Sequence, residues 1–172
     1  MTKRSAGLLI YRFTESGDPS APSHPSAPSA SRAETLEILI AHMGGPFFAR
    51  KDDAAWSIPK GEYEPPEEPL AAARREFEED MGSPPPAGNY LELGEFRQSS
   101  GKIVTIFATP GDFDVTTFAS NSFEMEWPRG SGRIQTFPEM DRAAWFSLET
   151  AAIKLVKGQL PVLAALRTEL RL

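Results

Sequence analysis

The feature that most constrains the fold is a helical segment with a proline-based boundary at each end. Three prolines precede it and three follow it: Pro65, Pro66 and Pro69, then Pro84, Pro85 and Pro86. Proline is tolerated in the first turn of a helix but not in its interior, and a glycine followed by prolines is a stop signal. The sequence therefore predicts a helix over residues 70–81 that ends at Gly82.

Strand-like runs lie on both sides of this helix. They alternate or concentrate apolar residues between turn signals, and cover residues 6–13, 36–42, 90–97, 102–108, 123–127 and 143–146. From Leu148 onward the pattern becomes helical, in two pieces broken by Gly158 and Pro161. Strands around a central helix predict a layered α/β domain, and 172 residues suit a single domain over 1–172.

A stretch from about residue 15 to 34 is built mostly from Ser, Ala, Pro and Gly. Such a composition cannot form a packed core, so we expect a flexible loop between two neighbouring strands. A linker without function and a loop that contacts substrate or a partner are both compatible with it.

Composition excludes several classes of function. The chain has no cysteine, which rules out disulfides, a thiolate metal site and a cysteine nucleophile. The net charge of −6 argues against a long nucleic acid as partner. No apolar run approaches the roughly 18 residues of a membrane span, and the N-terminal apolar run is short for a signal peptide. We expect a cytoplasmic protein without a membrane partner.

The predicted helix concentrates carboxylates on one side. Glu76, Glu79 and Asp80 fall within an arc of roughly 100° beside an apolar face. Like charges this close repel one another, and a divalent cation would remove the repulsion. Oxygen ligands without histidine or cysteine favour Mg²⁺ or Mn²⁺. The alternative is a solvated charged face in which Arg75 forms an ordinary ion pair with Glu79.

The spacing around these carboxylates resembles the signature of the Nudix (MutT-like) hydrolase superfamily. The matching positions are Gly61, Glu67, Arg75, Glu76, Phe77, Glu79 and Gly82. Asp80 replaces the second glutamate of a pair, and Ser83 replaces a bulky apolar residue. The segment from Trp56 to Gly61 also resembles the Trp-x-x-Pro-Lys-Gly sequence that precedes this signature in diadenosine-polyphosphate hydrolases and mRNA-decapping enzymes.

The resemblance implies a Nudix fold, an α/β/α sandwich around a mixed sheet. It also implies a pyrophosphohydrolase that uses Mg²⁺ or Mn²⁺ to cleave a nucleoside diphosphate linked to a further group. The metal ligands implied are Glu76, Glu79, Asp80 and the backbone carbonyl of Lys60. Glu67 and Arg75 are implied as the pair that supports these catalytic carboxylates, by locking the preceding loop to the helix.

The general base is not decided by the signature. Glu76 is the first candidate, and glutamates on later segments are alternatives: Glu124, Glu126 and Glu139. The alternation of Glu124 and Glu126 with apolar residues is equally typical of a half-exposed strand.

Substrate contacts are predicted upstream of the helix. Lys60, Arg50 and Lys51 could meet phosphates, although Arg50 and Lys51 also suit a surface turn. Trp56 could stack on a base or belong to the core, as could other aromatic residues nearby, Phe47, Phe48 and Trp127. We interpret His42 as a strand-end residue rather than a metal ligand.

Three functions follow from these patterns. The first is metal-dependent hydrolysis of a small nucleotide diphosphate, of the nucleoside triphosphate or dinucleoside polyphosphate type. The second is a non-catalytic Nudix-fold module that senses a nucleotide. The third, hydrolysis of an RNA cap, rests only on the Trp-x-x-Pro-Lys-Gly likeness, and the acidic charge counts against it. Nudix domains are often dimers, so a homodimer is also open.

Overall fold

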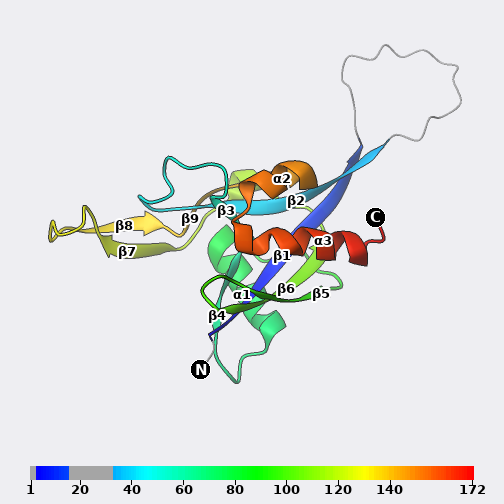
Figure 1. The fold of residues 1–172 in the computed structure, drawn as a ribbon, viewed down its shortest axis with the longest axis horizontal. Helices are drawn as coiled ribbons and strands as arrows, with labels where there is room; N and C mark the ends of the chain where they lie inside the picture. The colour runs from blue at the N-terminus through cyan, green and yellow to red at the C-terminus, as the bar shows by residue number, and fades with distance from the viewer. Residues whose placement is uncertain (1–2, 16–32) are drawn as a thin grey trace, which may run out of the picture.

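The computed structural model describes residues 3–15 and 33–172 (Figure 1). The helices are α1 (Pro69–Met81), α2 (Leu148–Lys154) and α3 (Leu160–Glu169), with 3₁₀ turns at Val115–Thr117 and Lys157–Gln159. The strands are β1 (Arg4–Glu15), β2 (Glu34–Met43), β3 (Trp56–Ser57), β4 (Lys60–Tyr63), β5 (Leu91–Arg97), β6 (Ile103–Pro110), β7 (Ser122–Glu126), β8 (Ile134–Pro138) and β9 (Met140–Ser147).

Seven strands form one mixed sheet around β1. The order is β3-β2-β1-β6-β5, with β4 also paired to β1 and β9 to β2. The pairing of β1 with β6 is parallel and the other pairings are antiparallel. A strand in this central position is buried on both faces, which explains why β1 is apolar from Ala6 to Tyr11 without alternation.

Helices cover both faces of the sheet. Alternate residues of β1 point to opposite sides: Leu8 belongs to the cluster that contains Phe77 of α1, and Leu9 belongs to the cluster that contains Leu148 and Leu166 of α2 and α3. The predicted α/β/α sandwich is therefore confirmed. Among the described residues, no helix has the length and apolar character needed to cross a membrane.

The central helix has the boundaries that its sequence predicts. Pro69 lies in its first turn, and Gly82 adopts a left-handed φ of 84° while its N–H donates to the carbonyl of Glu78 at 2.8 Å. A residue with a Cβ is strained at this φ, which explains the glycine. The neighbouring main chain of Ala119 donates to Met81 at 3.1 Å, so the end of α1 is held by a distant segment.

Elsewhere the sequence gives the elements but not all their limits. The six predicted strands are present, whereas the short strands β3, β4 and β8 are not anticipated by periodicity. The C-terminal break falls between α2 and α3, and Pro161 lies in the first turn of α3 instead of interrupting a helix. Most of the predicted loop, residues 16–32, lies outside the described residues, but Glu15 and Glu34 at its borders are directly paired.

The strands β7 and β8 form a separate two-stranded sheet. This hairpin extends away from the helices and the main sheet (Figure 1). Its side chains are exposed or half-buried along both strands. The hairpin therefore leads the chain out from the sheet and returns it at Glu139, beside α1.

Candidate active site

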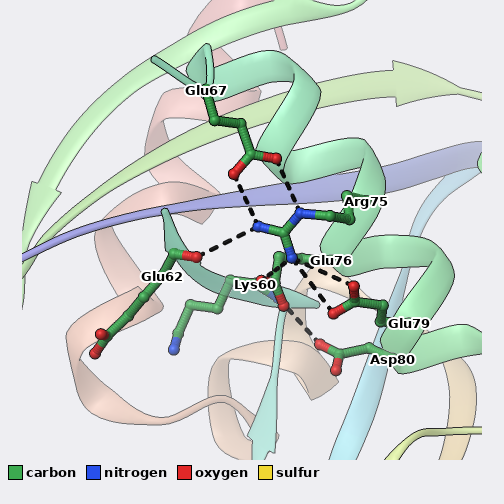
Figure 2. Close-up of polar contacts among 7 residues, drawn as sticks. All are labelled: Lys60, Glu62, Glu67, Arg75, Glu76, Glu79 and Asp80. Carbon is green, nitrogen blue, oxygen red and sulfur yellow. Dashed lines mark hydrogen bonds and ion pairs between the residues drawn. The ribbon is translucent and has the colours of Figure 1, made fainter. Parts of the chain in front are cut away.

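Arg75 joins the helix to the segment that precedes it (Figure 2). Its Nε and Nη2 donate to the two carboxylate oxygens of Glu67 at 2.9 and 3.0 Å. Its Nη1 donates to Glu76 Oε1 at 2.6 Å and lies 3.4 Å from both oxygens of Glu79. One guanidinium thus organises three carboxylates.

The electrostatic interaction between Arg75 and Glu67 favours the charged form of both side chains. The hydrogen bond from Arg75 lowers the pKa of Glu67 below its ordinary value. The same bond, together with Glu76, holds the pKa of Arg75 above its usual range. A bidentate arginine–carboxylate pair also fixes orientation, so Glu67 and Arg75 are geometrically suited to hold the residues before α1 against the helix.

Glu76 lies against the main chain of β4. A Cβ atom on Gly61 would overlap its carboxyl group, so this approach requires glycine. Glu76 is 9% exposed, and burial raises its pKa despite the hydrogen bond from Arg75. The helix and the strand therefore press a carboxylate into a site where its charge is costly.

Asp80 is buried one turn further along the helix, with 1% exposure. Its Oδ2 accepts the backbone N–H of Lys60 at 3.2 Å, and its Oδ1 has no hydrogen-bond partner. Burial, with Glu139 and Glu76 nearby, raises its pKa to about 7. A buried carboxylate oxygen without a partner is rare and costly, and indicates a position where a ligand would be favourable.

Glu139 is the distant glutamate that the fold brings to these carboxylates. Its proximity raises the pKa of both Glu76 and Asp80. Its backbone N–H donates to Asn121 at 2.8 Å, and Asn121 in turn donates to the carbonyl of Glu79 at 2.9 Å. The C-terminal turn of α1 therefore sets the position of Glu139.

The other two base candidates lie elsewhere. Glu124 and Glu126 are exposed on β7, in the hairpin that extends away from α1 (Figure 1). Glu126 Oε1 accepts the N–H of Gly132 at 2.6 Å, a contact inside the hairpin. Both residues occupy the half-exposed strand face that their alternation indicates.

The predicted substrate residues occupy different environments. Arg50 and Lys51 are exposed in the segment between β2 and β3. Lys60 follows in β4, where burial and then Lys102 lower the pKa of its side chain. Trp56 is 3% exposed, and its ring contacts His42 and Phe146, so its face is part of the core and is not available to stack on a base.

The donor set suits a hard divalent cation in its chemistry. It consists of carboxylate oxygens, one of them unpartnered, that lie against the main chain of β4 at Lys60 and Gly61. Over residues 3–15 and 33–172, no group of three His, Asp or Glu side chains is arranged so that it could hold a metal ion as it stands. Figure 2 shows the carboxyl groups of Glu76 and Glu79 directed toward Arg75.

Sequence reasoning misses residues that support the site from far along the chain. Gln159 is 2% exposed, its Oε1 accepts the N–H of Ile58 at 2.8 Å, and its Nε2 donates to Ser57 at 2.8 Å. It thereby fixes the segment that leads to Lys60. No local pattern marks Gln159 or Asn121, because their partners are distant in sequence.

Comparison with known proteins places this arrangement in a family. Curated protein sequences gave no match. Solved structures gave several matches at 13–22% sequence identity, and these share the fold. A Caenorhabditis elegans Ap4A hydrolase has 18% identity and a TM-score of 0.55, covering 97% of this chain and 98% of that one. The NUDIX domain of Shewanella oneidensis NrtR, complexed with ADP ribose, has 13% identity and a TM-score of 0.57, covering 99% and 89%.

A third similar structure is a mutT/nudix family protein from Listeria innocua. It has 15% identity and a TM-score of 0.57, covering 98% of this chain and 94% of that one. The decisive match is to the family model described as NUDIX domain, which covers residues 24–166 and so includes the whole carboxylate site. The chain belongs to the Nudix family.

Proposed function

We propose that this protein is a pyrophosphohydrolase that cleaves a diphosphate bond in a nucleoside diphosphate linked to a further group. Membership of the Nudix family supports this reaction class. The observation that carries the proposal is the buried pair Glu76 and Asp80, whose pKa values are both raised by burial, with one oxygen of Asp80 unpartnered. Perturbed carboxylates gathered at one place are typical of a functional site.

The residues that would hold Mg²⁺ or Mn²⁺ are Glu76, Glu79 and Asp80, with the carbonyl of Lys60. When bound, such an ion neutralises phosphate oxygens and acidifies a water molecule. The other groups act through position. Arg75 holds the carboxylates in place, and Glu67 holds Arg75 through two hydrogen bonds.

Glu139 is the better placed candidate for accepting a proton from the attacking water. It is exposed and lies beside Glu76 and Asp80, whereas Glu76 already accepts a short hydrogen bond from Arg75. Arg50, Lys51 and Lys60 are proposed to contact the phosphates, because their side chains are cationic. Arg50 and Lys51 lie in the segment before β3, and Lys60 is the first residue of β4.

The test is a substrate panel with Mg²⁺ or Mn²⁺ and detection of released phosphate, pyrophosphate or nucleotide. The panel contains ATP, GTP, ADP-ribose and diadenosine tetraphosphate, the last two because proteins of similar fold are an Ap4A hydrolase and a domain complexed with ADP ribose. We expect turnover that Glu79→Gln abolishes. Glu78→Gln, an exposed neighbour on the same helix, is the matched control.

A nucleotide sensor is the second candidate. The hydrogen bonds from Arg75 to Glu76 and Glu79 favour it, because carboxylate oxygens paired with a guanidinium group are less available to a cation. Nucleotide binding that survives a chelator, with no turnover across the panel, would support the sensor over the enzyme. A small-molecule partner is common to both candidates. A homodimer and a cytoplasmic location stay predictions from the sequence.

A further inference from the structure

A histidine outside the carboxylate site lies between two hydrogen-bond acceptors. His42, near the end of β2, is 0% exposed. Its Nδ1 lies 2.7 Å from Asp141 Oδ1, and its Nε2 lies 2.6 Å from the backbone carbonyl oxygen of Lys51. Neither ring nitrogen reaches water, so these two contacts account for its polar atoms.

Both partners of this ring are acceptors. A carbonyl oxygen cannot donate, and an ionised carboxylate cannot donate either. A neutral imidazole carries a single N–H, so with an ionised Asp141 one of the two contacts would bring lone pairs face to face. Two donated hydrogen bonds require a proton on each nitrogen, as in an imidazolium ion-paired with a carboxylate.

Charged groups next to His42 and Asp141 form a connected network of ion pairs. Arg142 lies 3.8 Å from Asp141 and 3.7 Å from Asp52. Asp52 also accepts Trp56 Nε1 at 2.9 Å and pairs with Lys154 from α2. Acidic and basic groups therefore alternate from β9 across to α2, with His42 at the inner end.

His42 connects two parts of the proposed reaction site. On one side its strand reaches Gly44, whose N–H donates to the carbonyl of Glu139 at 2.8 Å. On the other side its ring holds the main chain of Lys51, next to Arg50. A Cβ on Gly44 would overlap the carbonyl of Pro138, so the strand end and the Glu139 segment are in close contact.

We propose that His42 is a positioning residue: as an imidazolium anchored by Asp141, it fixes the Lys51 carbonyl and so orients the segment 44–52. This segment carries two of the cations proposed to contact substrate phosphates. The inference rests on the proposed function only for that role, because the protonation and the fixing of the segment are properties of the folded chain itself.

The protonation is tested by ¹⁵N NMR of the histidine ring. The chain has two histidines, so His24→Gln leaves a single ring to observe. We expect both nitrogens of His42 to carry protons at pH 7. In Asp141→Asn the amide can donate to Nδ1, so we expect one nitrogen to lose its proton. A single protonated nitrogen in the wild-type ring, or an unchanged ring in Asp141→Asn, would overturn the proposal.

The positioning is tested by hydrogen exchange of peptides covering 44–52 and α1. Loss of a charge-assisted hydrogen bond in His42→Gln should make exchange in 44–52 about tenfold faster and leave α1 unchanged. In Asp141→Asn the His42 ring keeps an N–H that can donate to the Lys51 carbonyl. Residues 44–52 should therefore exchange more slowly in this variant than in His42→Gln. Equal exchange in wild type and His42→Gln, or faster exchange everywhere, would contradict a local positioning role.

Kinetics then connect the segment to substrate. With the best substrate of the panel, His42→Gln should raise KM about tenfold and change kcat less than about twofold, since uniform binding would be lost. A fall in kcat at unchanged KM would overturn the assignment. Absence of turnover in the wild-type enzyme would refute the proposed function instead, while the NMR and exchange results would still decide the state of His42.

Discussion

The carboxyl group of Glu76 occupies the space that a side chain on Gly61 would need. The helix α1 and the strand β4 can approach only because residue 61 is glycine, and the approach is what buries Glu76. We therefore expect Gly61→Ala to displace the carboxylate and reduce kcat about 100-fold, the order of effect that a displacement near 1 Å produces. Gly158→Ala, where a Cβ meets only ordinary contacts, is the control.

Thermal unfolding of both glycine variants separates catalysis from folding. Gly61→Ala should lower Tm because one of two packed elements must shift, but circular dichroism should still report a folded domain. If Gly61→Ala retained wild-type kcat and Tm, neither catalysis nor stability would depend on the close approach of Glu76 to β4.

Arg75 is the donor shared by three carboxylates, so its replacement should affect all of them. Arg75→Lys keeps the charge but loses the bidentate contact with Glu67, and we expect kcat/KM to fall about 10- to 100-fold. Arg74→Lys is the matched control, since Arg74 is exposed and points over Tyr90. Equal activity of the two variants would show that charge alone, not the fork geometry, supports the site.

Substitutions of Glu139 and Glu124 test whether the general base lies beside the carboxylates or on the hairpin. Glu139→Gln should reduce kcat by about 10² to 10⁴, the usual contribution of a general base, whereas Glu124→Gln should leave it unchanged. The measurement is kcat at saturating substrate and metal. A larger loss from Glu124→Gln would indicate that the hairpin folds over the site during turnover.

The sequence predicts the helix and its carboxylates well because their determinants are local. Proline, glycine and helical spacing act over a few residues, so the limits of α1 and the partners of Arg75 within it can be anticipated. Glu139 could be identified only as one of three alternatives to Glu76 as the general base. Its place depends on hydrogen bonds that link Asn121 to the end of α1, and no spacing in the sequence encodes that contact.

Very short strands and contacts between distant segments could not be predicted from the sequence. The strand β3 has two residues, too few to show a period, and it exists because β2 and the C-terminal segment flank it. Trp56 could be assigned to substrate or core with equal reason from sequence. Its burial follows from the packing of His42 and Phe146 against its ring, which only the tertiary structure supplies.

Gln159 should contribute to stability through the segment that it holds. Gln159→Leu removes both hydrogen bonds of the side-chain amide and leaves the N–H of Ile58 without an acceptor, which costs about 1–3 kcal/mol for a buried group. We expect a lower midpoint in urea with an unchanged m-value. Gln98→Leu is the control, because Gln98 lies next to a turn and is only half-buried, whereas Gln159 is buried. An unchanged midpoint would show that water replaces the lost contact.

Asp80 should make the metal-free protein less stable as pH rises. Its pKa is 3.8 ordinarily and about 7 in the folded chain, so between these values the folded state binds a proton that the unfolded state has released. The free energy of unfolding therefore falls with pH across this window, by at most about 1.4 kcal/mol per pH unit from this group. Below pH 4 the contribution is fully present, and above pH 7 it is lost.

Urea unfolding in a chelator at pH 5, 6, 7 and 8 measures that slope. Asp80→Asn is neutral at every pH and should flatten the dependence, while Glu78→Gln, at an exposed position on the same helix, should preserve it. Added Mg²⁺ should stabilise the wild-type protein more at pH 8 than at pH 5, because the ion favours the ionised carboxylates. A wild-type stability that rises from pH 5 to pH 8 in the chelator would contradict the burial of an uncompensated carboxylate at this position.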